Sequence, residues 1–139
     1  MNYLLDTNAC IALINGKPPS VRAKFQKATA KRAQVFVSSI AAFELWYGVA
    51  KSSRREFNRK RLEAFFAGPL YHVPFANEDA EIAAAIRADL ESSGKPIGAY
   101  DLLIAGQAIR NKLTLITSNL SEFARIKALT REDWGKPEL

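Results

Sequence analysis

The sequence predicts an α/β fold in which helices cover both faces of a central, mostly parallel sheet. Three observations support this prediction. Short apolar runs alternate with longer helical segments, and Gly, Pro or Ser residues mark the boundaries between them. The 139 residues, of which 48% are hydrophobic and 24% charged, suffice for one core. No repeat or long linker interrupts the pattern, so we expect a single domain over residues 1–139.

The first strand is expected at residues 3–5, where the apolar run YLL precedes Asp6. A short helix follows it and ends at the Asn15-Gly16 pair, which is typical of a helix C-terminus. The proline pair Pro18-Pro19 then introduces a second helix, which is expected to extend to about residue 31.

The second strand is expected at residues 35–38 (VFVS), because β-branched and aromatic residues favour strands. Ser38 or Ser39 is expected to cap the helix that starts with IAAFELWYGVA. Another helix is predicted over about residues 54–66, and the Gly68-Pro69 pair stops it.

The second half of the chain predicts two more strands, YHV (71–73) and TLITS (114–118). Between them, Asn77 opens a long helix that Gly94 ends, and IGAYDLLIAGQAIRN (97–111) forms another helix. We expect the C-terminal tail to be irregular or partly helical. Strands that alternate with helices in this way favour parallel pairing.

Two polar segments lie at predicted carboxyl ends of strands, the edge at which α/β sheets bind ligands. DTN (6–8) follows the first strand, and SNLSE (118–122) follows the fourth. The first of them places Asp6 at the end of a buried strand. An ionised carboxylate there is costly unless a partner stabilises it.

Two further carboxylates are expected to face the interior. The residues three and four positions from Glu44 along its helix carry no charge. Asp101 begins DLLIAGQAI, nine residues without another charge. Because a helix that is apolar all round is a buried one, Asp101 is expected at its buried N-terminal end.

Each acid also has a purely structural interpretation, in which Asp6 caps a helix, Asp101 is a first-turn acid or a cap, and Glu44 pairs with a buried arginine. Three carboxylates that converge on one low-dielectric edge repel one another, however, and demand protonation or a cation. With one cysteine, Cys10, and one histidine, His72, a zinc site with soft ligands is excluded. A hard cation such as Mg²⁺ or Mn²⁺ fits oxygen ligands.

The apolar stretch ACIALI near the start is too short for a membrane span and has no basic flank typical of a signal peptide. We therefore expect a cytoplasmic protein without a membrane association. The chain is basic, with 20 Lys and Arg against 14 Asp and Glu and a formal net charge of +6. This balance favours a polyanionic partner without proving one.

Four sequence blocks resemble a PIN-domain ribonuclease, specifically a toxin of the VapC type. They are YLLDTNACIALI, SSIAAFELWYGV, IGAYDLLIAGQA and LITSNLSEF, in this order across nearly the whole chain. The resemblance implies a Mg²⁺-dependent endoribonuclease, with Mn²⁺ as a substitute, whose acidic core is Asp6, Glu44 and Asp101. It also implies an RNA substrate, often a tRNA, a VapB-type antitoxin that occludes the site, and a homodimer.

Under this resemblance, Asp6 and Asp101 are expected to bind the metal directly, and Glu44 to hold or deprotonate a water molecule. Asn119 stands where many relatives have Asp. Either Asn119 orients a water molecule or Glu122 supplies the missing charge. Four polar residues are candidates for orienting the carboxylates: Thr7, Asn8, Thr117 and Ser118.

Candidate contacts for RNA or for the antitoxin lie in the basic segment KSSRREFNRKR (51–61) and beside Asp101. In the alternative interpretation, the segment is a solvated helix face beside core positions. Tyr100 adjoins Asp101 and would stack on a base, although such aromatic residues more often pack in the protein. The candidate contact residues are Arg54, Arg55, Arg59, Arg61 and Tyr100.

Two other functions compete with the nuclease. A phosphoacceptor receiver domain needs an acidic pair after its first strand and a lysine after its last, and this chain has one acid and TSN there. A non-catalytic PIN-like module that binds RNA or protein is the stronger alternative. Metal-dependent RNA cleavage distinguishes the two.

Overall fold

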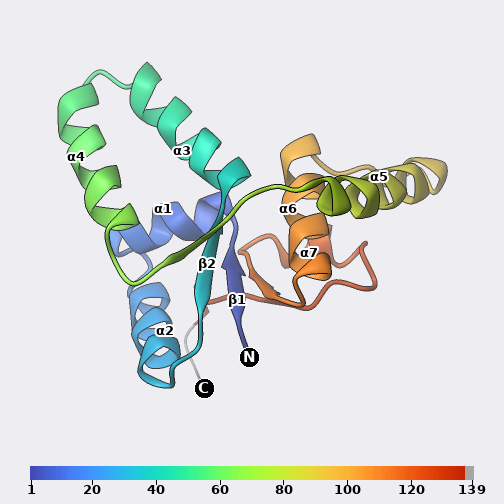
Figure 1. Ribbon diagram of the computed structural model, residues 1–139, viewed down its shortest axis with the longest axis horizontal. Coiled ribbons are helices and arrows are strands. Elements are labelled where there is room, and N and C mark those ends of the chain that lie inside the picture. Colours follow the sequence, from blue (N-terminus) through green and yellow to red (C-terminus); the bar gives the residue numbers. More distant parts are fainter. Residues whose placement is uncertain (137–139) are drawn as a thin grey trace.

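The structure, a computed structural model, describes residues 1–136 and contains a five-stranded sheet in the order β3-β2-β1-β4-β5 (Figure 1). Every strand pair is parallel. The strands are β1 (Tyr3–Leu5), β2 (Val35–Ser38), β3 (Tyr71–Val73), β4 (Thr114–Ile116) and β5 (Arg131–Glu132). The predicted α/β fold with a parallel central sheet is confirmed.

The sheet differs from the prediction at its C-terminal end. β4 stops at Ile116, so Thr117 and Ser118 lie beyond the strand instead of inside it. The tail was expected to be irregular or partly helical; it contains the short helix α7 (Leu120–Phe123), as expected, and also adds the edge strand β5. β5 pairs with β4 and accepts the backbone N–H of Thr117 at the Glu132 carbonyl, at 3.0 Å.

Seven helices connect the strands in the described part of the chain. Gly16, with φ of 70°, ends the first of them in the left-handed conformation that glycine adopts easily. Ser38 caps the third, because its hydroxyl accepts the N–H of Ile40 at 2.9 Å. The helices are α1 (Thr7–Asn15), α2 (Pro19–Ala30), α3 (Ser39–Lys51), α4 (Arg55–Phe66), α5 (Asn77–Ser92), α6 (Ala99–Arg110) and α7 (Leu120–Phe123).

The order of the strands determines which face each helix covers. The chain passes from β1 through β2 to β3, then returns to β4 and β5 on the other side of β1. Right-handed connections between parallel strands therefore place α1 to α4 on one face and α5 to α7 on the other. Figure 1 shows the two groups on the left and right of the sheet. The connections from β1 and from β4 therefore run toward opposite edges of the sheet. The carboxyl end of such a strand pair is where α/β sheets bind ligands.

The core centres on the three middle strands. Leu5 pairs with both Val37 and Ile116, so the residues that follow on β1 and β4, Asp6 and Thr117, come together at the carboxyl edge. The apolar strand side chains that are completely inaccessible to solvent are Leu4, Leu5, Val35, Val37 and Leu115. The first acidic residue of the predicted site is thus fixed to the most buried part of the fold.

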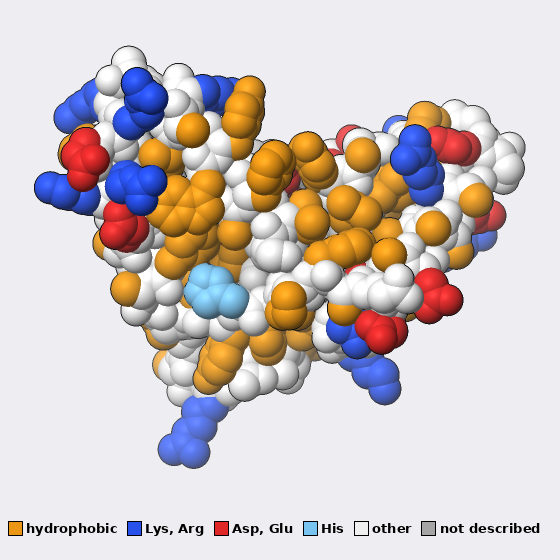
Figure 2. All heavy atoms as spheres, turned by 45° about the horizontal axis from the view of Figure 1, so that its top comes forward, with side chains coloured by type: hydrophobic (Ala, Val, Ile, Leu, Met, Phe, Trp, Pro, Cys, Tyr) orange, Lys and Arg blue, Asp and Glu red, His pale blue; other side chains and the backbone are white. Residues whose placement is uncertain are grey.

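The surface carries large apolar side chains. Figure 2 shows hydrophobic side chains gathered between the two raised ends of the molecule. Phe43, Tyr47 and Tyr100 are 55%, 58% and 47% exposed. Among residues 1–136, no helix has the length and apolar character that crossing a membrane requires.

Candidate active site

Asp6 lies at the junction of β1 and α1 and is only 5% exposed. Its Oδ1 accepts the N–H of Ala9 at 2.7 Å, so it caps α1. Burial raises the pKa of this carboxyl above its usual value, hydrogen bonds from the Thr117 hydroxyl and the Ala9 N–H lower it, and the charges of Glu44 and Asp133 raise it, with a net increase. Asp6 is therefore a cap whose charge is not neutralised.

Glu44 lies on α3 and is partly buried. The hydroxyl of Thr7, the first residue of α1, donates a hydrogen bond of 2.6 Å to Glu44 Oε1. The structural alternative, in which a buried arginine pairs with Glu44, does not describe this contact. Thr7 instead holds the carboxylate beside the end of β1, as expected for a residue that orients an acid.

Asp101 stands in the first turn of α6 and is partly buried. Burial, followed by the charges of Asp6, Glu122 and Glu44, raises the pKa of its carboxyl to about 6. All the charges that produce this shift are carboxylates. The structure therefore brings the three predicted acids within electrostatic range of one another and adds Glu122 to them.

Asn119 and Glu122 act together. The Asn119 side-chain amide donates a hydrogen bond of 2.8 Å to Glu122 Oε2, and the Asn119 backbone N–H donates one of 3.0 Å to Thr117 Oγ1. Of the two alternatives for the fourth position, the geometry favours Glu122 as the source of negative charge. Asn119 then orients Glu122, and we call Asp6, Glu44, Asp101 and Glu122 the acid cluster.

Asp133 was not expected from the sequence. It follows β5 directly, and its charge contributes to the raised pKa of Asp6. It lines a cavity of about 110 Å³ together with Asn8, Thr117 and Ser118, so these last three candidates lie beside it. Because β5 has only two residues, no periodic pattern in the sequence indicates it.

The acid cluster suits a hard divalent cation by its chemistry. The donors are carboxylate, amide and hydroxyl oxygens, and burial together with mutual repulsion disfavours the ionised form of Asp101. As placed in residues 1–136, however, no three Asp, Glu, His or Cys side chains converge closely enough to enclose an ion. A cation here would therefore be held by one or two of the carboxylates, with water molecules completing its coordination. The donor set fits Mg²⁺, and metal binding by the acid cluster stays a prediction.

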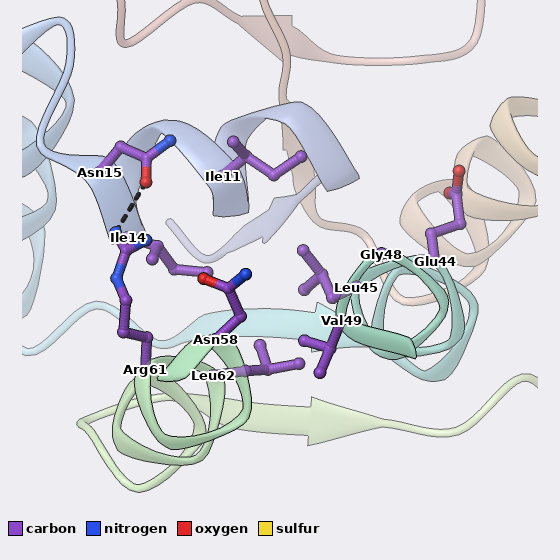
Figure 3. A pocket seen from close by; sticks show the side chains of 10 residues that line it. All are labelled: Ile11, Ile14, Asn15, Glu44, Leu45, Gly48, Val49, Asn58, Arg61 and Leu62. Carbon is purple, nitrogen blue, oxygen red and sulfur yellow. Dashed lines mark hydrogen bonds between the residues drawn. The ribbon is translucent and has the colours of Figure 1, made fainter. Parts of the chain in front are cut away.

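One basic candidate, Arg61, lines the same pocket as Glu44. Arg61 donates a hydrogen bond of 2.8 Å to Asn15 Oδ1. It lines a pocket of about 180 Å³ between α1, α3 and α4, with an apolar floor that includes Leu45 and Leu62. Figure 3 shows Glu44 at the opposite end of this pocket from Arg61. The pocket thus connects the basic helix α4 with the acid cluster.

The other arginines of the basic segment are exposed and contact aromatic rings or solvent. The Arg54 guanidinium lies 4.0 Å from the centroid of the Phe57 ring, and that of Arg59 lies 5.2 Å from the Trp46 ring. Arg55 is exposed at the start of α4. These contacts match a solvated helix face, and contact with RNA or antitoxin stays a prediction.

Tyr100 borders the acid cluster on α6. Its ring packs edge to face against Phe43 of α3, with ring centroids 5.8 Å apart. Both side chains remain about half exposed. Tyr100 is therefore accessible to a base or a protein partner directly beside Asp101.

Comparison with known proteins gives a consistent result. The model of the PIN domain family matches residues 3–129. The chain is 40% identical to Ribonuclease VapC2 of Rickettsia felis over 136 residues, which are 98% of this chain and 100% of the relative. It is 38% identical to the tRNA(fMet)-specific endonuclease VapC of Salmonella typhimurium over 134 residues, 96% of this chain and 98% of the relative.

Solved structures agree with the sequence relatives. The structure of VapBC2 from Rickettsia felis, bound to a DNA fragment from its promoter, aligns with a TM-score of 0.89 at 39% identity. The alignment covers 96% of this chain and 99% of that chain. The DNA-bound VapBC structure from Salmonella typhimurium aligns with a TM-score of 0.87 at 38% identity, over 96% and 98% of the two chains.

Proposed function

This chain belongs to the PIN domain family, and we propose that it is a Mg²⁺-dependent endoribonuclease that acts as the toxin of a VapBC-type toxin–antitoxin pair. The observation that carries the proposal is the acid cluster at the carboxyl edge of a parallel sheet, in which burial and the charges of the other three carboxylates all oppose the ionisation of Asp101. The substrate class we propose is tRNA, because a relative of 38% identity is named a tRNA(fMet)-specific endonuclease.

Asp6 and Asp101 are the residues that would hold Mg²⁺, since they follow β1 and begin α6 at the same edge. When bound, Mg²⁺ supplies Lewis acidity, which lowers the pKa of water and neutralises phosphate charge. The Ala9 N–H and the Thr117 hydroxyl fix the Asp6 carboxylate before any ligand arrives. Such preorganisation avoids rearrangement during the reaction.

Glu44 is the residue we propose as the proton acceptor for an attacking water molecule. Its Oε1 is held by Thr7 at 2.6 Å, so its position is defined, and among residues 1–136 its Oε2 accepts no hydrogen bond. Asn119 holds Glu122 in the same manner at 2.8 Å. Water attack on the phosphodiester would leave a 5′-phosphate and a 3′-hydroxyl.

The proposal includes a VapB-type antitoxin and a homodimer as partners. Exposed Phe43, Tyr47 and Tyr100 give this surface the aromatic character of protein interfaces. The similar structures from Rickettsia felis and Salmonella typhimurium are VapBC complexes. A cytoplasmic location belongs to the same proposal, since RNA substrate and antitoxin would be encountered there.

A non-catalytic PIN-like binding module is the second candidate. The observation that favours it is the spacing of the acids, which among residues 1–136 do not enclose an ion as placed. In such a module the acid cluster would remain without a cation, and the surrounding surface would bind RNA or protein without cleaving it.

Cleavage of purified tRNA tests the proposal. The chain is incubated with a tRNA transcript in Mg²⁺, in Mn²⁺ and in excess EDTA, beside identically purified Asp6→Asn protein as a control for contaminating nucleases. We expect cleavage only by the parent with a divalent cation, with 5′-phosphate ends. Undiminished cleavage in EDTA, or 2′,3′-cyclic phosphate ends, would contradict the proposed chemistry. Binding without cleavage would favour the second candidate.

A further inference from the structure

A second groove lies on the α5 to α7 side of the molecule. It has a volume of about 780 Å³ and runs between the C-terminal part of α5 and the segment from α7 to residue 128. We infer that this groove binds the sugar–phosphate backbone of the RNA next to the acid cluster, an inference that rests on the proposed function. Its polar lining residues are Asp89, Ser93, Lys95, Ser121, Arg125 and Lys127.

The charge of the groove suits phosphate. Three cations, Lys95, Arg125 and Lys127, line it against one carboxylate, Asp89, and all three cationic residues are exposed. The nearby Glu91 is paired with Arg87 at 3.0 Å, so it does not offset them fully. Phosphate contacts from such residues provide affinity irrespective of base sequence.

The groove adjoins the acid cluster along two segments of the chain. On α7, Ser121 lines the groove while its neighbour Glu122 acts on Asp101. On the loop before α6, Lys95 lines the groove and leads toward Asp101. The groove and the acid cluster therefore share α7 and the loop before α6, so one RNA strand could contact both.

A hydrogen bond fixes the groove in relation to the acids. Arg125 Nη1 donates to the Pro96 carbonyl oxygen at 2.9 Å, which joins the end of α7 to the loop before α6. The two walls that carry Lys95 and Lys127 are thus held together. A positive surface in this fixed position offsets the repulsion that the acid cluster exerts on approaching phosphates.

The test replaces Lys95 and Lys127 by Ala in one variant and leaves Arg125 in place, because Arg125 also holds the loop. A matched control replaces Lys17 and Lys31, two exposed lysines at the ends of α2, and loses the same charge. Steady-state cleavage of a tRNA transcript in Mg²⁺ is measured from about 50 to about 200 mM salt.

For the groove variant we expect KM to rise about tenfold with kcat unchanged, and the salt dependence of binding to weaken by about 1.5 units of slope. The control should keep the parental KM. If the groove variant and the control behave alike, the inference is overturned. It is also overturned if KM is unchanged while inhibition by the antitoxin is lost, because the groove then binds protein.

Failure of the proposed function gives a different result. In that case the parent itself cleaves no tRNA, and the same variants are compared by fluorescence anisotropy of the labelled transcript. Selective loss of tRNA affinity in the groove variant would still support an RNA-binding groove. Equal affinity in parent, groove variant and control would overturn it independently of catalysis.

Discussion

Two buried carboxylates in this fold, Asp79 and Asp6, differ in the charges that surround them. Asp79 on α5 is 0% exposed, and its two oxygens accept the Nε–H of Arg110 at 2.5 Å and the Ala76 N–H at 2.7 Å. Asp6 is 5% exposed and also has hydrogen bonds, but the charges that act on it are the carboxylates of Glu44 and Asp133. One acid is neutralised by a cation, and the other is surrounded by more acids.

The difference separates a structural acid from a functional one. A buried carboxylate with an arginine partner has its charge compensated within the fold and needs no ligand. A buried cluster of carboxylates lowers stability unless something binds it, and such clusters are typical of functional sites. Asp79 thus shows what a purely structural acid looks like in this chain, and the acid cluster does not resemble it.

The largest expected effect comes from Asp101→Asn. If Asp101 is a functional acid, cleavage of tRNA in Mg²⁺ should fall at least about 100-fold, because the variant lacks a carboxylate that would hold the ion that neutralises phosphate charge. The metal-free variant should melt at or above the parental temperature, because a neutral amide at this partly buried position in the first turn of α6 avoids the burial of a charge and the repulsion by neighbouring carboxylates. A folded variant with near-parental cleavage would leave Asp101 as a structural residue.

Asp79→Asn should show the opposite pattern. Both oxygens of Asp79 accept hydrogen bonds, so an amide would turn its NH₂ group toward one donor and would remove the charge that pairs with Arg110. We expect the free energy of unfolding to fall by about 2 kcal/mol. Cleavage per folded molecule should stay parental. Urea denaturation measures the stability and steady-state kinetics of the same preparation measure the cleavage. A reduced kcat in fully folded protein would contradict the assignment of Asp79 as a structural residue.

The smallest expected effect is on the pH dependence of the free energy of unfolding, measured in the absence of metal. The Asp101 carboxyl has a pKa of about 6 in the folded protein, against the ordinary value of 3.8 for an aspartate side chain. The folded state therefore binds more protons between these values. The Asp101 carboxyl therefore makes its full favourable contribution to stability below the unfolded-state pKa. This contribution is lost as the pH rises through about 6.

Urea denaturation in EDTA at about pH 4 and about pH 7 measures this effect. Relative to the parent, Asp101→Asn should gain about 1 kcal/mol of stability over this range, after allowance for solvent screening of a half-exposed carboxyl. Asp79→Asn serves as a control variant with intact Asp101. A stability difference between Asp101→Asn and the parent that does not change with pH would exclude the proposed repulsion.

Much of the fold follows from local sequence. The apolar runs at β1, β2, β3 and β4 and the turn or cap residues between them predict the strands, because strand type and helix boundaries depend on neighbours in sequence. β5 is not predictable in this way. Its two residues are a strand only because β4 offers them a pairing edge.

The site residues also differ in how far the local sequence indicates them. Asp6, Glu44 and Asp101 are recognisable because each is an acid in an otherwise apolar context. The roles of Glu122 and Asp133 depend on contacts that form only after folding, through the hydrogen bond from Asn119 and through β5. The Asp79–Arg110 pair joins residues of two helices, and their spacing in sequence does not indicate it.

Calorimetric titration with Mg²⁺ tests most directly whether the acid cluster is a cation site. Parent, Asp79→Asn and Asp101→Asn proteins are titrated at the same pH and ionic strength. The account predicts that Mg²⁺ binds the parent and Asp79→Asn with equal affinity, and Asp101→Asn at least about tenfold more weakly. Absence of Mg²⁺ binding by the parent, or equal binding by all three proteins, would contradict it.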